Sequence, residues 1–186
     1  MRTLAITQNL TLDGRIEMLG DWFDQQQQGA PDQADMLAEQ HRQAAANDAL
    51  LLGRHTFLAF RGYWRDLTDD STGIADHLNT IDKYVVSSTL TEPDWSGTTV
   101  VAEDPVAAVH RLKQEPGGHI VCTGSIQLTH RLIEAGLVDE YRLFTYPVAQ
   151  GAGRRLFPEG HSTSGLRVAE ATAFGSGVGY QRWVAA

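Results

Sequence analysis

The chain has a single cysteine among its 186 residues, and this scarcity excludes several classes of protein. One cysteine forms no disulfide framework within the chain and cannot build a multi-cysteine zinc site. Cys122 lies in the apolar stretch 119–123, which predicts a buried strand, so we expect a small buried hydrophobe rather than a catalytic thiol. The seven histidines do not cluster at ligand spacing. We therefore expect no metal site.

Long apolar runs and positive charge are scarce as well. No apolar segment approaches the roughly 20 residues that span a bilayer, and the N-terminus has no charged-then-apolar signal pattern. We therefore expect a cytoplasmic protein without a membrane partner. The formal net charge is −8 and no run of Lys or Arg could follow a phosphate backbone, so nucleic acid is not an expected partner. An anionic ligand would need local donors, such as helix N-termini and one or two arginines.

The chain instead alternates apolar, strand-like segments with helix-forming segments, and its length suits one domain spanning residues 1–186. Strands separated by helices indicate an α/β protein with a mostly parallel sheet covered on both faces, a three-layer α/β/α arrangement. Residues 21–33 are expected to form an exposed loop. We expect helices at 34–46, 74–80, 105–114 and from 124–125 to about 136, and strands at 3–7, 49–52, 84–86, 98–102, 119–123, 140–148, 166–174 and 180–184.

The last three predicted strands follow one another without helices, which predicts an antiparallel C-terminal edge on a mixed sheet. We expect segments 141–146 and 166–174 to be edge strands there. Exposed strand edges need covering, and pairing into a homodimer is one common solution. The glycine-rich stretch 175–179 lies between two of these strands with no helix after it, so it predicts a hairpin turn rather than a dinucleotide loop.

Three of the predicted strands end in polar turns, two of which contain glycine. In an open α/β sheet, ligands lie in the crevice outside the carboxyl ends of the strands. Glycines in such turns let the backbone approach a ligand closely, and a helix that begins there offers free N–H groups to phosphate. Each turn alone is also explained by ordinary turn chemistry, but together they suit a phosphate-bearing dinucleotide. The turns are Gly53-Arg54-His55-Thr56, Ser87-Ser88 and Thr123-Gly124-Ser125-Ile126.

The three turns in this order resemble the dihydrofolate reductases. Gly53-Arg54-His55-Thr56 is similar to their GR-x-T signature, Ser87-Ser88 to the serines beside the adenosine 2′-phosphate, and Gly124-Ser125 to the glycine turn under the pyrophosphate. Thr123 departs from the pattern, because those enzymes usually carry a third glycine there.

Other segments resemble the reductase domain, the C-terminal part, of the riboflavin-biosynthesis bifunctional deaminase/reductase. These are Thr11 to Gly14, Gly136 to Glu140, Pro147-Val148, Gly151 to Gly153 and Leu156-Phe157. The deaminase motif, His-x-Glu with Pro-Cys-x-x-Cys, is absent from the sequence. The chain is therefore similar to the dihydrofolate-reductase-like superfamily and most similar to a stand-alone reductase domain.

This resemblance implies NADPH as the cofactor and assigns roles to individual residues. Gly53, Arg54, His55 and Thr56 would read its phosphates, and Ser87 and Ser88 would favour NADPH over NADH. Thr123, Gly124, Ser125 and Ile126 would hold the pyrophosphate at a helix N-terminus. Ala5, Asp13, Gly14 and Ile16 would lie near the nicotinamide.

The same resemblance implies a carboxylate early in the helix before the GR-x-T strand, placed to hydrogen-bond the substrate. Asp35 is the best candidate by spacing, with Asp32 and Glu39 as neighbours. If Asp35 faces an apolar pocket, its pKa should rise, as a proton donor needs. An acid in the first turn of a helix is equally explained by the helix dipole. Trp22 is expected either to wall the substrate pocket or to cover a core edge.

The implied function is hydride transfer from NADPH to a small heterocyclic substrate, most similar to 5-amino-6-(5-phosphoribosylamino)uracil reductase. No set of Lys and Arg residues is evident that would hold the substrate phosphate. The alternatives are dihydrofolate reductase activity, the same scaffold with a flavin or deazaflavin, a non-catalytic NADPH-binding protein, and an interaction module that binds no cofactor.

Overall fold

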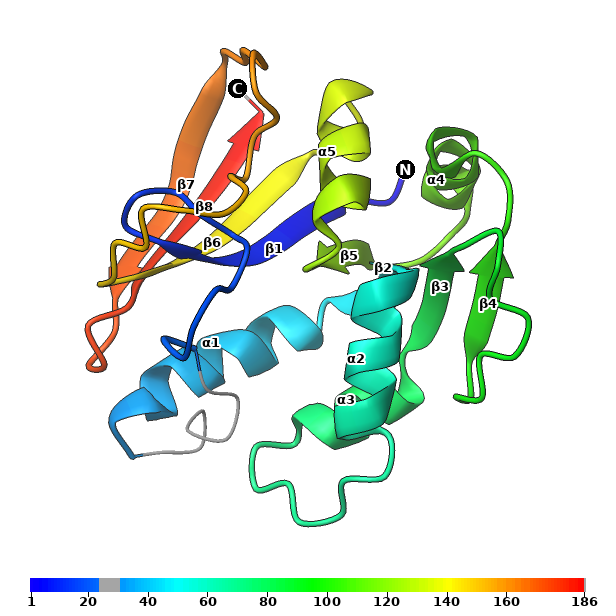
Figure 1. The fold of residues 1–186 in the computed structure, drawn as a ribbon, viewed down its shortest axis with the longest axis horizontal. Coiled ribbons are helices and arrows are strands. Elements are labelled where there is room, and N and C mark those ends of the chain that lie inside the picture. The colour runs from blue at the N-terminus through cyan, green and yellow to red at the C-terminus, as the bar shows by residue number, and fades with distance from the viewer. Residues whose placement is uncertain (24–30, 186) are drawn as a thin grey trace.

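A central eight-stranded sheet organises the computed structural model of the chain, which describes residues 1–23 and 31–185 (Figure 1). The strand order is β4-β3-β2-β5-β1-β6-β8-β7. Strands β1 to β6 are parallel to one another, whereas β8 is antiparallel to β6 and β7 is antiparallel to β8. The strands are β1 (Leu4–Thr11), β2 (Asn47–Gly53), β3 (Asp82–Val86), β4 (Thr98–Val101), β5 (His119–Thr123), β6 (Glu140–Tyr146), β7 (Leu166–Ala173) and β8 (Gly179–Ala185). The helices are α1 (Ala34–Ala44), α2 (Arg54–Trp64), α3 (Ile74–Thr80), α4 (Pro105–Gln114) and α5 (Ile126–Glu134), with a 3-10 turn over Pro31–Gln33.

Helices cover both faces of the sheet, which explains why its inner strands are apolar at consecutive positions. On β2, Leu51 belongs to the core shared with α4 and α5, whereas Leu50 and Leu52 belong to the core shared with α2 and α3. Alternate side chains of a strand point to opposite faces, so α2 and α3 lie on one side and α4 and α5 on the other. Figure 1 shows these two groups below and above the sheet.

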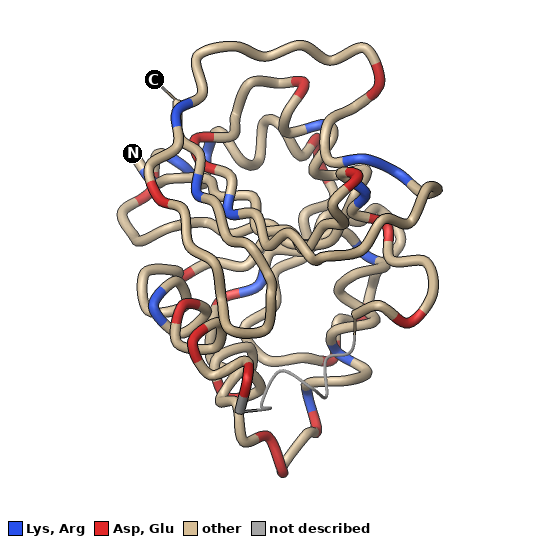
Figure 2. Tube along the Cα trace, turned by 90° about the vertical axis from the view of Figure 1, so that its left-hand side faces the viewer, with Lys and Arg blue, Asp and Glu red and all other residues tan. Residues whose placement is uncertain are grey.

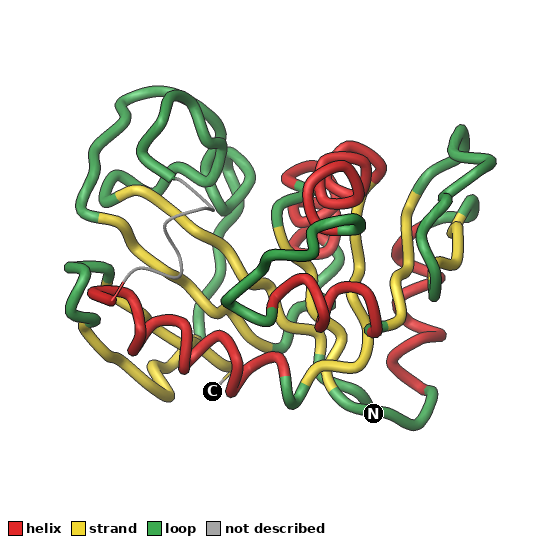
Figure 3. The backbone as a smooth tube through the Cα atoms, turned by 90° about the horizontal axis from the view of Figure 1, so that it is seen from below, coloured by secondary structure: helices red, strands yellow, loops and turns green. Residues whose placement is uncertain are grey.

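A third apolar cluster joins α1 to the antiparallel end of the sheet. Met36 of α1 packs with Phe144 of β6 and Tyr180 of β8. In the view from below, α1 runs beside the strands (Figure 3). With α1, α2 and α3 on one face and α4 and α5 on the other, the predicted three-layer α/β/α arrangement and its antiparallel C-terminal edge are confirmed.

Local signals placed several elements correctly. Helix α4 begins where Asp104 accepts the Ala107 N–H at 3.1 Å and Pro105 occupies the first turn, as N-cap and N1 preferences require. Cys122 is fully buried, and burial raises the pKa of its thiol to about 12. No helix among the described residues is long and apolar enough to cross a bilayer.

Three expectations need correction. The segment 141–146 is not an edge strand, because β6 pairs with β1 on one side and β8 on the other, and β7 is the edge. The first strand extends beyond residue 7 to Thr11, since it pairs along its whole length with β6. The first helix ends at Ala44 rather than at 46, where a turn leads directly into β2. Of the predicted loop 21–33, residues 24–30 lie outside the described residues, and Pro31–Gln33 forms the 3-10 turn.

Candidate functional site

Strands β2 and β5 lie side by side, and the helices that follow them leave toward opposite faces of the sheet. Helix α2 contributes Phe57 to the core on one face, while α5 contributes Leu128 to the core on the other. In open α/β sheets such a divergence opens a crevice outside the carboxyl ends of the strands, where ligands bind. The turns at Gly53 and Gly124 therefore meet at the point where the topology favours a site.

Two reciprocal hydrogen bonds join these turns. The Gly53 N–H donates to Ser125 Oγ at 2.9 Å, and the Ser125 N–H donates to Thr56 Oγ1 at 2.9 Å. The N-termini of α2 and α5 are thereby held beside each other. Each hydroxyl oxygen accepts one of these bonds, so its own proton is left to donate. Neither hydroxyl donates that proton to a protein acceptor within the described residues.

The backbone at the second turn requires glycine. Gly124 has a φ of +56°, and a Cβ there would lie 2.9 Å from Thr56 Cγ2. Both the left-handed conformation and the close approach exclude a side chain. Ser125 also has a positive φ, +45°, a costly conformation that concentrates at functional sites. Gly53 is different, because its φ of −80° suits any residue.

Several donors without a partner among the described residues lie at this end of the sheet. Neither α2 nor α5 has a side-chain N-cap, so their first-turn N–H groups are available to an anion. Arg54 and His55 are exposed in the first turn of α2, and Arg54 forms no ion pair with a described residue. Figure 2 shows basic positions scattered among acidic ones along the trace. These local groups, rather than a broad basic surface, are what the chain offers to a phosphate.

The Ser87-Ser88 turn follows the carboxyl end of β3, the strand beside β2. In the parallel register of β2 and β3, Gly53 pairs with Val86, so Arg54 and Ser87 leave neighbouring strand ends. Ser87 is buried, and its Oγ accepts two N–H groups of the following turn at 3.2 and 3.0 Å. Ser88 is exposed. Arg54 and Ser88 are thus the accessible pair at this end, while Ser87 shapes the turn between them.

The two other predicted pyrophosphate residues flank the Gly124-Ser125 turn. Thr123 ends β5, is half-buried and pairs with Thr7 of β1. Ile126 begins α5 and its side chain packs against the core. Only the main-chain N–H of Ile126 is therefore placed for an anion.

Of the residues expected near the nicotinamide, two have buried side chains. Ala5 is fully buried within β1, and Ile16 is 4% exposed in the core beneath α5. Gly14 has a φ of +77° and forms the turn after β1. Core packing buries both side chains, so the expectation that Ala5 and Ile16 lie near the nicotinamide stays a prediction about their main-chain atoms.

Asp13 acts as a link between two loops. Its carboxylate accepts the Thr11 hydroxyl at 2.6 Å and the N–H groups of Gln150 and Gly151 at 3.0 and 2.9 Å. These hydrogen bonds, that of Thr11 foremost, hold the pKa of Asp13 below its usual range. Asp13 thus fixes the loop after β6 to the loop after β1.

Asp35 is exposed, so the condition for a raised pKa, a carboxylate facing an apolar pocket, is not met in this structure. Its Oδ2 accepts the Gly175 N–H at 2.8 Å, so the carboxylate is hydrogen-bonded to the turn of the β7–β8 hairpin. Asp32 is also exposed. Glu39, one turn later, accepts hydrogen bonds from Arg42 at 2.7 Å, away from the strand ends.

Trp22 joins an aromatic cluster at the carboxyl end of β6. Its ring lies 5.3 Å from that of Tyr146 and 6.1 Å from that of Phe23, both in edge-to-face contact. Its indole N–H donates to Gln150 Oε1 at 2.7 Å. Trp22 therefore lies at the same edge of the sheet as the turns at Gly53 and Gly124.

Sequence reasoning missed two groups of this region. Gln8 of β1 is 3% exposed, and its amide donates to the Gly124 carbonyl at 2.7 Å. A polar residue at a position that continues the buried pattern of Leu4 and Ile6 was the available signal. The other is Gln150, which no local pattern marks, because its side-chain partners Glu17, Leu19 and Trp22 are more than 120 residues away.

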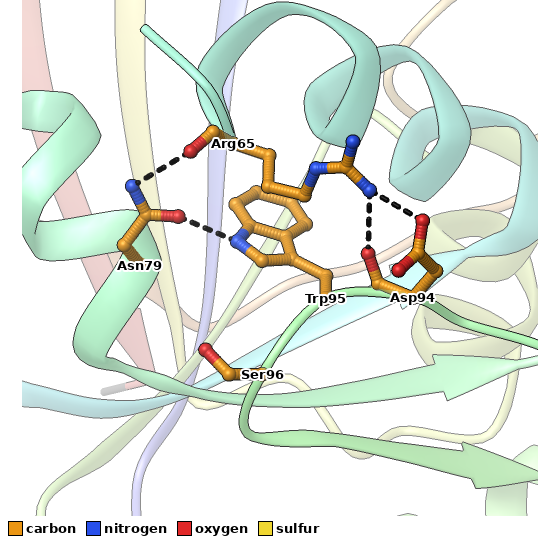
Figure 4. A pocket seen from close by; sticks show the side chains of 5 residues that line it. All are labelled: Arg65, Asn79, Asp94, Trp95 and Ser96. Carbon is orange, nitrogen blue, oxygen red and sulfur yellow. Dashed lines mark hydrogen bonds and ion pairs between the residues drawn. The ribbon is translucent and has the colours of Figure 1, made fainter. Parts of the chain in front are cut away.

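A separate open depression of about 490 Å³ lies near the amino ends of β3 and β4 (Figure 4). Its polar groups bind one another: the Trp95 indole N–H donates to Asn79 Oδ1 at 2.6 Å, and Arg65 pairs with Asp94. Ser96 completes the lining. The depression lies at the amino ends of the strands, whereas the crevice lies at their carboxyl ends, so the two are separate. Four of its five lining residues also use their polar groups on one another.

The comparison with known protein families agrees with this geometry. Residues 2–180 match the RibD C-terminal domain. The chain belongs to the RibD C-terminal domain family. The resemblance to the dihydrofolate-reductase-like superfamily is thereby confirmed.

Individual relatives share this fold. The uncharacterised protein YyaP of Bacillus subtilis is 32% identical over 133 residues, which cover 70% of each chain. A candidate riboflavin biosynthesis protein from Shewanella sp. PV-4 superposes with a TM-score of 0.71 at 18% identity, over 99% of both chains. A pyrimidine reductase-like protein from Corynebacterium diphtheriae superposes with a TM-score of 0.67 at 13% identity, over 100% of this chain and 92% of the other.

A bifunctional protein with a similar fold is longer than the region that matches this chain. The diaminohydroxyphosphoribosylaminopyrimidine deaminase/5-amino-6-(5-phosphoribosylamino)uracil reductase of Thermotoga maritima superposes with a TM-score of 0.65 at 13% identity. The match takes in 100% of this chain but 57% of the Thermotoga protein. At these identities the superpositions establish the fold.

Proposed function

We propose that the chain is an NADPH-dependent reductase that transfers hydride to a small heterocyclic substrate, of the 5-amino-6-(5-phosphoribosylamino)uracil reductase type. The observation that carries this proposal is the pair of joined helix N-termini at Gly124-Ser125 and Gly53. The donor set fits a dinucleotide's phosphates: two uncapped helices, two hydroxyl protons and Arg54, which pairs with no described residue.

The order of the strands supports one orientation of such a cofactor. Arg54 and Ser88, at the ends of β2 and β3, would bind the 2′-phosphate, and the turn between β2 and β5 would bind the pyrophosphate. The next strands in the order, β1 and β6, would then lie under the nicotinamide end of the cofactor. Neighbouring strands are about 4.8 Å apart, so this direction spans the length of an extended dinucleotide in a few strand widths.

When bound, NADPH supplies a hydride to an electrophilic carbon of the substrate, while the attached heteroatom takes up a proton. Asp13 is held ionised by its three hydrogen bonds, and Asp35 lies exposed against Gly175. These placements support proton delivery by water. They speak against dihydrofolate reductase activity, for which the resemblance implies a carboxylate in the substrate pocket.

The test is turnover followed by NADPH absorbance, with 5-amino-6-(5-phosphoribosylamino)uracil and dihydrofolate as separate substrates. We expect oxidation with the pyrimidine, and an increase of roughly tenfold or more in the KM for NADPH in Arg54→Ala, since charge-assisted hydrogen bonds contribute about 1.5–3 kcal/mol. Arg167→Ala, on the exposed edge strand, is the matched control and should behave as wild type. Faster turnover of dihydrofolate would favour that alternative, and tight NADPH binding without turnover would favour the non-catalytic one.

A further inference from the structure

One peptide group, that between Gly124 and Ser125, is hydrogen-bonded on both sides at the end of β5. Its carbonyl, that of Gly124, accepts a hydrogen bond from the Gln8 side-chain amide at 2.7 Å. Its N–H, that of Ser125, donates to Thr56 Oγ1 at 2.9 Å. A trans peptide group points its carbonyl and its N–H in opposite directions. The two hydrogen bonds therefore fix the rotation of this peptide group about the chain.

The two partners of this peptide group lie on opposite faces of the sheet. Side chains two residues apart on a strand share a face, so Gln8 lies on the face of Leu4 and Ile6, which pack in the core with α5. Thr56 belongs to the first turn of α2, which covers the other face. The peptide group is thus held between the two helical layers.

An amide at position 8 is not needed for the packing of β1. Gln8 is 3% exposed, and an apolar side chain in this place would avoid the cost of burying a polar group. Its Nε2 donates to the Gly124 carbonyl and, at 3.4 Å, to Thr129 Oγ1. Thr129 is fully buried, and its hydroxyl also donates to the Gly124 carbonyl, at 3.3 Å. Two buried polar side chains therefore converge on one carbonyl oxygen beneath the crevice.

The backbone held by these hydrogen bonds has a costly conformation. Ser125 has a φ of +45°, and a residue with a Cβ keeps such a conformation only where the surrounding structure enforces it. Rotation of the Gly124–Ser125 peptide group would relieve this positive φ. The same rotation would turn the buried carbonyl away from its donors and the N–H away from Thr56. Gln8 therefore opposes the movement that would separate the two turns of the crevice.

We infer that Gln8 is the positioning residue of the Gly124-Ser125 turn. By holding the Gly124 carbonyl inward, it directs the hydroxyls of Ser125 and Thr56 and the first N–H groups of α5 toward an anion. Gln8 acts through the peptide group rather than by touching the ligand. The inference rests on the proposed function for the identity of the anion, the pyrophosphate of the cofactor.

This role has a signature that differs from that of Arg54. NADPH and NADH share the pyrophosphate, so loss of the Gln8 amide should weaken both dinucleotides by the same factor. Loss of Arg54, which we assign to the 2′-phosphate, should weaken NADPH alone. The ratio of the two dissociation constants therefore separates the two roles.

The experiment measures the dissociation constants of NADPH, NADH and inorganic pyrophosphate, together with the free energy of unfolding in urea. Gln8→Met removes the amide at nearly constant shape, and Thr129→Val removes the second donor to the same carbonyl. Gln43→Met is the matched control, because Gln43 is also a buried glutamine, 8% exposed, and its amide donates to Glu39 Oε1 at 2.6 Å on α1. Hydrogen exchange of the Ser125 amide is followed by NMR without any ligand.

We expect Gln8→Met to weaken all three ligands roughly tenfold, about 1.4 kcal/mol, with the wild-type ratio of NADPH to NADH affinity. Thr129→Val should weaken them about two- to threefold, as for loss of a weak hydrogen bond. Exchange of the Ser125 amide should accelerate in Gln8→Met, because its hydrogen bond to Thr56 opens more often. A merely structural role would lower the free energy of unfolding and leave the three dissociation constants unchanged, as we expect for Gln43→Met.

Two results would overturn the inference and leave the proposed function intact: wild-type dissociation constants in Gln8→Met, or a loss confined to NADPH. Unchanged exchange of the Ser125 amide would overturn it as well. Should Gln8→Met not fold, Thr129→Val decides, since unchanged constants there would show that the donors to the Gly124 carbonyl do not position the turn. Binding of neither dinucleotide by wild type, with pyrophosphate binding that depends on Gln8, would overturn the proposed function and retain the inference. Binding of none of the three ligands would overturn both.

Discussion

Replacing Gly124 by alanine tests the geometry of the crevice directly. Gly124 has a φ of +56°, and the left-handed conformation costs alanine about 1–2 kcal/mol. The new Cβ would lie 2.9 Å from Thr56 Cγ2, and relieving such an overlap costs about 1–3 kcal/mol more. We therefore expect Gly124→Ala to lose about 2–5 kcal/mol of unfolding free energy, read from urea denaturation. Because the displaced Thr56 also holds Ser125, NADPH affinity should fall at least tenfold.

Two further variants separate the causes of this loss. Gly136 follows the other end of α5 with a φ of +65° and has no atom within 4 Å of an added Cβ. Gly136→Ala should therefore lose only about 1–2 kcal/mol and keep NADPH affinity. Thr56→Ser removes Cγ2, so in the Gly124→Ala background it should recover part of the stability. Equal losses in Gly124→Ala and Gly136→Ala, or no recovery with Thr56→Ser, would refute the reasoning.

Three further predictions follow from single side chains. Asp35→Asn should keep kcat within about twofold of wild type in the NADPH assay, because the carboxylate is exposed and tied to Gly175, whereas a general acid contributes about 100-fold or more. Burial, and then the neighbouring Arg142, hold the pKa of His119 below its usual range, so the unfolded chain gains a proton first as pH falls. Unfolding free energy should therefore decrease below about pH 6.5, by up to about 1.4 kcal/mol per pH unit, and His119→Asn should reduce this slope in urea denaturation at several pH values. Lys83 is fully buried with its ammonium on two main-chain carbonyls at 2.7 Å, so Lys83→Met should cost about 2–4 kcal/mol in the same assay.

Each of these three predictions has an outcome that would contradict it. A loss of about 100-fold in kcat for Asp35→Asn would identify the carboxylate as the proton donor. A pH slope unaffected by His119→Asn would show that other groups carry the acid sensitivity. Wild-type stability in Lys83→Met would mean that water satisfies the two carbonyls as well as the ammonium does.

The elements that the sequence predicts well are those whose signals are local. Asp104-Pro105 marks the start of α4, and the apolar run 119–123 matches β5 to the residue. The crevice turns are visible for the same reason, since glycine and helix-start chemistry act within a few residues. Their order along the chain carries the resemblance that identifies the family.

Contacts between distant segments could not be predicted in this way. Spacing selects Asp35, but its direction is set by Gly175, 140 residues later. Two other hydrogen bonds likewise depend on the order of the strands: that from the Ser125 N–H to Thr56 and that from the Gln150 N–H to Asp13. The position of β6 inside the sheet depends on the crossover through α5, which no local pattern specifies.

The most direct test of the central claim is the pair of dissociation constants of wild-type protein for NADPH and NADH, measured by the change in nicotinamide fluorescence. The two cofactors differ only in the 2′-phosphate, which we assign to Arg54 and Ser88. We predict that NADPH binds at least tenfold more tightly, a difference of about 1.4 kcal/mol or more, and that Arg54→Ala removes most of this preference. Equal affinities would contradict the assignment of Arg54 and Ser88, and binding of neither cofactor would contradict the account as a whole.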